Sequence, residues 1–208
     1  MKTEGSRHFS MIRGFRTADL VTLANGFAGM GSVLASMKFV ASGATGWMWL
    51  AFGLLPLALV ADVADGRIAR RRGVLSILGQ ELDSLADLVS FGVAPATLGF
   101  ALGLQDGLDA LALIFFVGCG ISRLARYNAT AASLAGPGGK VRYYEGTPIP
   151  TSLVIVALLA VFAGLGRIGD SLPLRHISDG PTGLHPLSLL YVLSGIAMVS
   201  KTLRIPKP

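Results

Sequence analysis

The stretch that decides the fold is residues 62–87, DVADGRIARRRGVLSILGQELDSLAD. It holds five acidic and four basic residues, although only 14% of the 208 residues of the chain are charged. Soluble domains usually carry about a quarter of charged residues. The stretch therefore concentrates charge at one point of a chain whose composition otherwise suits lipid.

The rest of the chain is apolar: 52% of its residues are hydrophobic, and they come in long blocks instead of amphipathic stripes. This pattern predicts an all-α integral membrane protein. The net charge of +6 fits cytoplasmic loops and contact with anionic lipid better than nucleic acid, so no nucleic-acid partner is expected. The single cysteine, Cys119, excludes an intrachain disulfide and is interpreted as a small buried hydrophobe.

Six apolar blocks are long enough to cross a bilayer, which takes about 20 residues. They are residues 18–41, 46–66, 79–104, 108–128, 149–167 and 184–203. The sequence thus predicts a six-helix transmembrane domain over residues 18–205. Residues 1–17 mix arginine with phenylalanine, methionine and isoleucine, which suits either a juxtamembrane amphipathic helix on the cytoplasmic face or a disordered tail.

The basic residues predict the orientation. With six spans, 15 of the 18 Lys and Arg residues fall on one side of the membrane, and only Lys38, Arg167 and Arg175 fall toward the other. The positive-inside rule then places both termini in the cytoplasm. An odd number of spans would break this alternation.

Four aspartates of the opening stretch lie at the cytoplasmic ends of the second and third spans. Asp62 and Asp65 are spaced i, i+3, whereas Asp83 and Asp87 are spaced i, i+4, so each pair shares one face of its helix. A short connection makes the two helices antiparallel neighbours. We therefore expect all four carboxylates to converge on one pocket at the membrane boundary.

Converging carboxylates repel each other, and bound cations relieve that repulsion. Oxygen ligands without His or Cys favour Mg²⁺, Mn²⁺ or Ca²⁺, and four carboxylates suit two metals about 4 Å apart that bridge a phosphoryl substrate. Gly66 and Gly79 permit close approach of a ligand or a helix, and Arg70 can meet phosphate oxygens. The alternative interpretation is that these charges are ordinary juxtamembrane charges. It applies only to Glu81, Arg71 and Arg72.

The same residues carry a family resemblance. Asp62-x2-Asp65-Gly66-x2-Ala69-Arg70-x8-Gly79-x3-Asp83-x3-Asp87 resembles the signature of the CDP-alcohol phosphotransferase family at every fixed position, and six spans are also that family's layout. Four further segments are similar to the branch that uses serine as acceptor: TLANGFAG (22–29), DSLADLVSFGVAPA (83–96), SRLARYN (122–128) and GTPIPTS (146–152). The last departs from the usual Gly-Leu-Pro-x-Pro-Ala at Thr147 and Thr151, which bears on the choice of head group.

The resemblance implies transfer of a phosphatidyl group from CDP-diacylglycerol to the hydroxyl of L-serine, with release of CMP. Asp62, Asp65 and Asp83 would be the main ligands of two divalent cations, Mg²⁺ or Mn²⁺, with Ca²⁺ binding in a non-productive state. Asp87 would share the second metal and act as general base. The resemblance also implies a homodimer. The expected location is a prokaryotic cell membrane, with the active site on the cytoplasmic side, where the basic residues place the aspartates.

Substrate-binding residues follow from the same resemblance. Gly66, Ala69 and Gly79 would line the cytidine pocket, with Arg70 and Asp65 near the diphosphate. Thr22 and Asn25 either face the nucleotide or form interhelical hydrogen bonds. The carboxylate of serine needs a cation, and the candidates are Arg123, Arg126, Lys140 and Arg142, whose alternative role is topology.

Two other functions compete with this interpretation. One keeps the chemistry but changes the acceptor to glycerol 3-phosphate, inositol phosphate or choline, or the donor to an archaeal-type CDP-lipid. The other is a divalent-metal transporter or channel, because acidic residues within spans can mark ion paths. Transport is disfavoured because the carboxylates gather at one face and the sequence has no internal repeat. The three histidines have no predicted role, and Asp106 and Asp109 are interpreted as helix-end residues.

Overall fold

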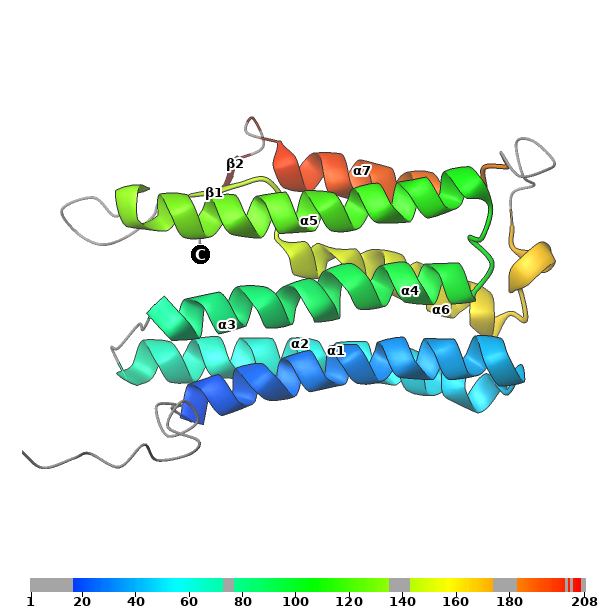
Figure 1. Ribbon diagram of the computed structural model, residues 1–208, viewed down its shortest axis with the longest axis horizontal. Helices are drawn as coiled ribbons and strands as arrows, with labels where there is room; N and C mark the ends of the chain where they lie inside the picture. The colour runs from blue at the N-terminus through cyan, green and yellow to red at the C-terminus, as the bar shows by residue number, and fades with distance from the viewer. Residues whose placement is uncertain are drawn as a thin grey trace, which may run out of the picture.

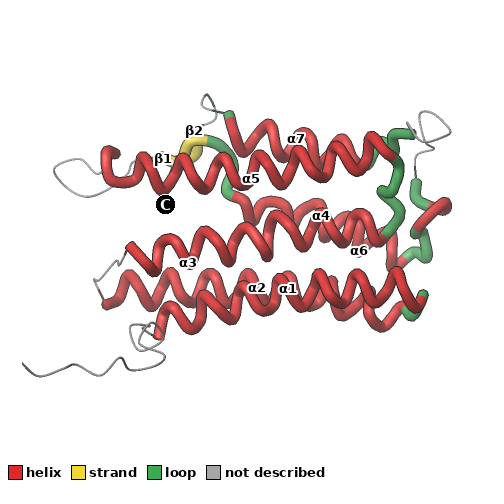
Figure 2. The backbone as a smooth tube through the Cα atoms, viewed as in Figure 1, coloured by secondary structure: helices red, strands yellow, loops and turns green. Residues whose placement is uncertain are grey.

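A computed structural model of the chain describes residues 17–72, 77–134, 143–173, 183–200, 202 and 204–206. Its elements are α1 (Thr17–Ser42), α2 (Thr45–Arg72), α3 (Ile77–Asp87), the π-helix η2 (Leu88–Val93), α4 (Ala94–Ala101), α5 (Gly107–Leu134), β1 (Tyr143–Glu145), the 3₁₀-helix η3 (Ile149–Ser152), α6 (Leu153–Gly164), the 3₁₀-helix η4 (Gly169–Ser171), α7 (Ser188–Val199) and β2 (Arg204–Pro206). The expected helical architecture is confirmed. The departure from an all-α chain is the short antiparallel pair β1 and β2, in which Tyr144 stands opposite Ile205 (Figure 2).

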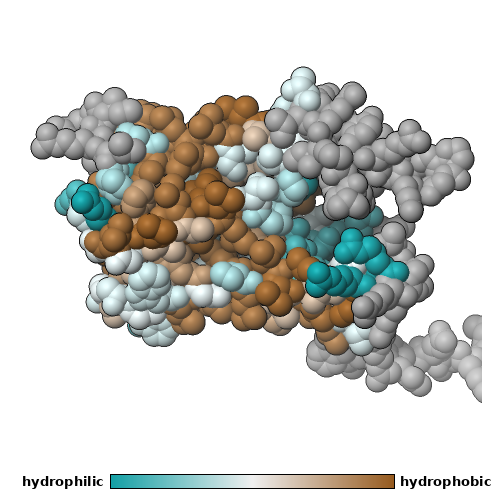
Figure 3. Space-filling view, turned by 180° about the vertical axis from the view of Figure 1, so that it is seen from behind, coloured by the Kyte–Doolittle hydropathy of each residue, from teal (hydrophilic) through white to brown (hydrophobic). Residues whose placement is uncertain are grey.

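Four helical stretches within the described residues are long and apolar enough to span a membrane: Thr17–Ser42, Thr45–Arg70, Leu78–Ala101 and Gly107–Thr130. Ile149–Gly164 and Ser188–Val199 are shorter apolar helices. Large apolar side chains also face outward, among them Phe27 (72% exposed) and Val154 (73% exposed). Figure 3 shows hydrophobic residues covering most of one face of the molecule. A water-soluble protein rarely exposes such a surface, so the chain is an integral membrane protein.

The helix bounds differ from the expected blocks at three places. α2 continues six residues beyond position 66, because residues 67–72 are isoleucine, alanine and arginine, which extend a helix past the apolar region. The block expected at 184–203 is helical only over Ser188–Val199. The block expected at 79–104 consists of α3, η2 and α4, and within it the Ala94 N–H donates to the Val89 carbonyl, five residues back.

The helices lie side by side in a bundle (Figure 1). α1 and α2 form an antiparallel hairpin, α3 and α4 pack along α1, and α5 packs on α7. The start of α1, the end of α2, the start of α3 and the end of α5 all lie at one end of the bundle (Figure 1). The described parts of the opening stretch, residues 62–72 and 77–87, therefore lie toward this end.

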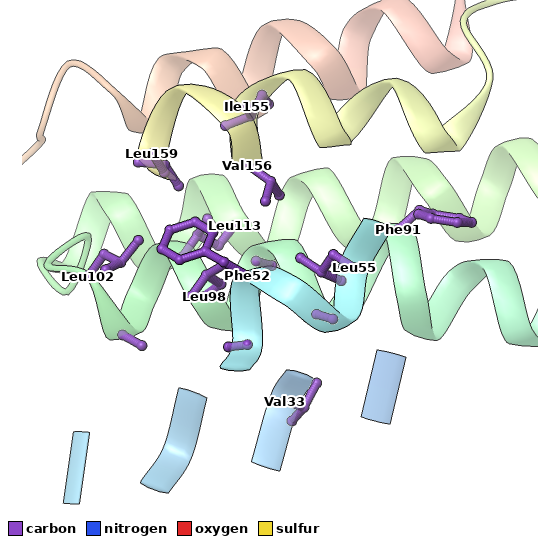
Figure 4. Close-up of a cluster of buried hydrophobic side chains, with 14 of the residues drawn as sticks. Val33, Phe52, Leu55, Phe91, Leu98, Leu102, Leu113, Ile155, Val156 and Leu159 are labelled. Atoms are coloured by element: carbon purple, nitrogen blue, oxygen red, sulfur yellow. The ribbon is translucent and has the colours of Figure 1, made fainter. Parts of the chain in front are cut away.

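The core fills the space between these helices. Leu55 from α2, Phe91 from η2 and Leu98 from α4 are completely buried, and Ile155 and Val156 from α6 line the same cluster (Figure 4). Tyr191 of α7 donates a hydrogen bond from its hydroxyl to the Pro95 carbonyl at 2.8 Å. Cys119 is a buried free cysteine, as expected.

Buried hydrogen bonds connect two helices at the opposite end of the bundle. Asp109 lies in the first turn of α5, as its interpretation as a helix-end residue predicts, but its side chain is completely buried. Its Oδ1 accepts a hydrogen bond from the His185 backbone N–H at 2.8 Å, and the Ser188 hydroxyl donates to the His185 carbonyl at 2.7 Å. These bonds attach the start of α7 to α5, which is a structural role that the sequence did not reveal for His185.

Candidate active site

Three of the four expected carboxylates meet at the α2–α3 end of the bundle. Asp62 from α2 and Asp83 and Asp87 from α3 each contribute a carboxylate oxygen, and these oxygens lie within 4.8 Å of one another. The i, i+4 spacing brings Asp83 and Asp87 to one face of α3, and the antiparallel neighbour α2 supplies Asp62. Oxygens of like charge at this separation repel strongly in a partly buried site.

Asp65 lies beside this group instead of within it. Its side chain is buried, and the Thr22 side chain and the Gly66 backbone N–H lie next to its carboxylate. Its Oδ2 has no hydrogen-bond partner among the described residues. A buried carboxylate oxygen without a donor is costly, so Asp65 has one coordination position available for a ligand.

Helix α1 forms a hydrogen bond to one of the α3 carboxylates. The Asn25 side-chain amide is completely buried and donates a hydrogen bond from Nδ2 to Asp87 Oδ1 at 3.1 Å. The Ser90 hydroxyl donates to the Asn25 carbonyl at 2.9 Å. Asn25 thus contacts the expected general base and forms the interhelical hydrogen bond that was one of the two roles considered for it.

The π-helix η2 follows directly after Asp87 and connects α3 to α4. A π turn adds one residue to the helix and often occurs at functional sites. The Ser152 hydroxyl of η3 donates to the Phe91 carbonyl at 2.7 Å, so a neighbouring side chain satisfies a carbonyl of the π-helix. Bonds on both sides therefore hold η2 in place immediately beyond the carboxylates.

The residues expected to bind the nucleotide surround the same end of α2. Among the described residues, a methyl group at Gly66 would meet only Arg70 Nη2, at 3.9 Å, so no described helix packs against this glycine. Arg70 is exposed, and Ala69 is partly exposed one residue earlier. Gly79 lies in the first turn of α3. Figure 3 shows hydrophilic atoms gathered at this end of the molecule.

Two of the four residues expected to bind serine are described. Arg123 and Arg126 are partly buried on α5. Lys140 and Arg142 lie outside the described residues. The N-terminal segment 1–16 is also outside them.

The sequence did not single out two polar residues near the site. Asp19 in the first turn of α1 is buried and close enough to Asp65 for electrostatic repulsion. The sequence signal for Asp19 was its position three residues before Thr22, which places both on the same helix face. Asn128 of α5 bonds to three residues of α3, including Glu81, whose side chain accepts a hydrogen bond at 3.2 Å. Glu81, interpreted above as surface charge, is exposed but also joins two helices.

The donor set suits hard divalent cations. All the converging side chains offer carboxylate oxygen, and no His or Cys belongs to the described group. The unpartnered Oδ2 of Asp65 is a further oxygen beside the group. Asp62, Asp83 and Asp87, with Asp65 next to them, therefore fit a divalent metal centre.

Comparison with known proteins identifies a family and several relatives with similar sequences. The family model for CDP-alcohol phosphatidyltransferase matches residues 15–199. A CDP-diacylglycerol–serine O-phosphatidyltransferase of Saccharomyces cerevisiae is 44% identical over 99% of this chain and 76% of its own length. A protein of the same name from Methanocaldococcus jannaschii is 32% identical over 78% of this chain and 75% of its own. An archaetidylserine synthase of Methanothermobacter thermautotrophicus is 36% identical over 67% of this chain and 55% of its own.

Proposed function

Because the chain belongs to the CDP-alcohol phosphatidyltransferase family, we propose that it transfers the phosphatidyl group of CDP-diacylglycerol to the hydroxyl of L-serine. The products are phosphatidylserine and CMP. The observation that carries the proposal is the convergence of Asp62, Asp83 and Asp87 at one end of a membrane-embedded bundle. The relatives from yeast and Methanocaldococcus, whose names specify serine, support the acceptor.

The reaction is a displacement at phosphorus. The serine hydroxyl oxygen forms a bond to the phosphatidyl phosphorus, and the bond from that phosphorus to the CMP oxygen breaks. Asp87 takes the hydroxyl proton as general base. Its Oδ1 accepts the hydrogen bond from Asn25 at 3.1 Å, so in our proposal Oδ2 takes the proton.

Asp62, Asp65, Asp83 and Asp87 would hold two divalent cations, Mg²⁺ or Mn²⁺, with Ca²⁺ binding in a non-productive state. When bound, these ions neutralise the charge on the diphosphate and on the leaving CMP. Gly66, Ala69 and Gly79 leave room for cytidine, and Arg70 meets the diphosphate. Thr22 lies beside Asp65 at the edge of this pocket. Arg123, Arg126, Lys140 and Arg142 are our candidates for the serine carboxylate.

The site lies where a soluble nucleotide and a lipid tail meet. In our proposal α6 and α7 complete six spans, both termini are cytoplasmic, and residues 18–205 form the catalytic domain. Residues 1–17 form a cytoplasmic segment. With six spans, 15 of the 18 basic residues fall on one side, which supports this orientation. We propose a prokaryotic cell membrane as the location. A homodimer follows from the family resemblance.

A panel of acceptors tests the proposal. The protein, purified in detergent, is given CDP-diacylglycerol, Mn²⁺ or Mg²⁺, and either serine, glycerol 3-phosphate, inositol phosphate or choline, and CMP release is measured. Serine is expected to be the productive acceptor. Release with another alcohol but none with serine contradicts the proposal.

The relative named archaetidylserine synthase favours one variant of this function, in which the donor is an archaeal-type CDP-lipid. A matched pair of donors that differ only in ester-linked and ether-linked chains decides between them. Faster turnover of the ether-linked donor at equal serine concentration would favour the archaeal-type donor.

A further inference from the structure

One amide side chain joins the helix of the carboxylates to the helix of the arginines. Asn128 Oδ1 accepts hydrogen bonds from Gln80 Nε2 and from the Ser84 hydroxyl, each at 3.2 Å. Its Nδ2 donates to Glu81 Oε2, also at 3.2 Å. A single side chain of α5 therefore contacts the first two turns of α3.

The register of the two helices places this cluster one turn from the carboxylates. Ser84 directly follows Asp83, and Asp87 lies three residues further along α3. Nearer the middle of the bundle, a methyl group at Gly120 of α5 would lie 3.7 Å from Leu88 Cδ1. Because the helices are antiparallel, Arg123 falls between these two contacts, at about the level of Asp87, given a rise of about 1.5 Å per residue.

We infer that Asn128 is a positioning residue for the acceptor: it sets the spacing between the α3 carboxylates and the α5 arginines across the place where serine binds. The inference rests on the proposed function. The acceptor has to place its hydroxyl at Asp87 and its carboxylate at a cation, so its binding depends on this spacing. Three residues of the proposed nucleotide pocket, Gly66, Ala69 and Arg70, belong to α2, which Asn128 does not contact in the described structure. The fourth, Gly79, lies in the first turn of α3.

The geometry distinguishes this role from simple support of the fold. The side-chain carbonyl and the side-chain amide of Asn128 both form hydrogen bonds. An apolar residue of similar shape therefore removes all three bonds while filling the same volume. Asn128→Leu is that change. Gln105→Leu is the matched control, because Gln105 Nε2 also makes an amide hydrogen bond, to the Phe100 carbonyl at 3.0 Å, but at the opposite end of the bundle.

The experiment measures KM for serine and KM for CDP-diacylglycerol separately on the full chain in detergent, together with thermal unfolding. Asn128→Leu is expected to raise KM for serine by about tenfold or more, since each lost hydrogen bond is worth up to about tenfold. KM for CDP-diacylglycerol should change much less, because Gly66, Ala69 and Arg70 of that pocket are on α2. Gln105→Leu should leave both values near those of the parent protein.

A charge rescue gives a second and independent test. Asn128→Asp sets a carboxylate against that of Glu81 and should raise KM for serine. Adding Glu81→Gln supplies an amide donor in place of the repelling charge and should bring KM for serine back toward the parent value. A purely structural role would lower the unfolding temperature without this selective change.

The inference is overturned if Asn128→Leu changes both KM values equally, or changes neither. It is also overturned if Glu81→Gln fails to restore the serine KM of a folded Asn128→Asp protein. These outcomes differ from failure of the proposed function, in which the parent protein itself would not use serine.

Discussion

At the scale of single residues, the pairing of Asn25 with Asp87 is the most informative contact. Burial of Asn25 means that its amide keeps a fixed orientation, and its Nδ2 occupies one oxygen of Asp87 at 3.1 Å. A carboxylate oxygen of Asp87 also lies within 4.8 Å of carboxylate oxygens of Asp62 and Asp83. The Asp87 side chain can therefore both belong to the cluster of three carboxylates and accept a proton.

Asp87→Asn tests the general base. The substituted amide can still pair with Asn25, so the fold is preserved, but it cannot take a proton. We expect kcat to fall by about 10²–10⁴-fold, the usual contribution of general base catalysis, while CDP still binds. CMP release and calorimetric binding of CDP measure the two effects.

Asp170→Asn is the control for this change, because Asp170 is exposed in η4, far along the chain from the carboxylates. It should behave as the parent protein does. Turnover of Asp87→Asn at more than a tenth of the parent rate would contradict the base assignment.

At the scale of elements, the close packing of α1 against the third helical stretch fixes the site. Gly29 faces Ser90, the residue that donates to the Asn25 carbonyl. A methyl group at Gly29 would lie 2.6 Å from the Ser90 Cα, which is backbone and cannot rotate away. α1 and η2 therefore approach each other only because position 29 has no side chain.

Gly29→Ala should push α1 away from η2 and destabilise the protein by about 1–3 kcal/mol, as overpacking does. Gly53→Ala in α2 is the matched control, because no atom of another described helix lies within 4 Å of the added methyl group. It should be neutral or stabilising by up to about 1 kcal/mol, since alanine favours a helix over glycine. Thermal unfolding in one detergent compares the two variants, and equal unfolding temperatures would refute the argument.

At the scale of the whole molecule, the carboxylates connect two helices that the chain joins only through residues 73–76. α2 contributes Asp62 and α3 contributes Asp83 and Asp87, so any ion held between them links both helices. Metal binding should therefore be visible in the stability of the entire bundle as well as in turnover.

Removal of divalent metal with EDTA should stop CMP release and lower the unfolding temperature, and Mg²⁺ or Mn²⁺ should restore both. A ligand present at one hundred times its Kd stabilises the folded state by about 2.7 kcal/mol. EDTA already saturated with Mg²⁺ controls for effects of the chelator itself. Asp62→Asn should reduce the metal-dependent shift in unfolding temperature, and full activity in excess EDTA would exclude the divalent metal centre.

Much of the fold was predictable from the sequence, because the signals were local. Long apolar blocks predicted the helices, and the i, i+3 and i, i+4 spacings placed each aspartate pair on one face. The ends of α2 and α7 were predicted less well, since hydropathy marks the apolar region and not the point where backbone hydrogen bonding stops. The strands β1 and β2 were missed because their pairing joins residues about 60 positions apart.

The sequence by itself determined the residue types of the site and the end of the bundle at which they lie. Only the tertiary structure decided which of them meet: Asp62 with Asp83 and Asp87, Asp65 beside Thr22, Asn25 on Asp87, and Asn128 on α3. The physical reason is that periodicity specifies which face of its own helix a side chain occupies. The distance between two helices depends instead on small residues such as Gly29 and on side chains contributed by a third helix.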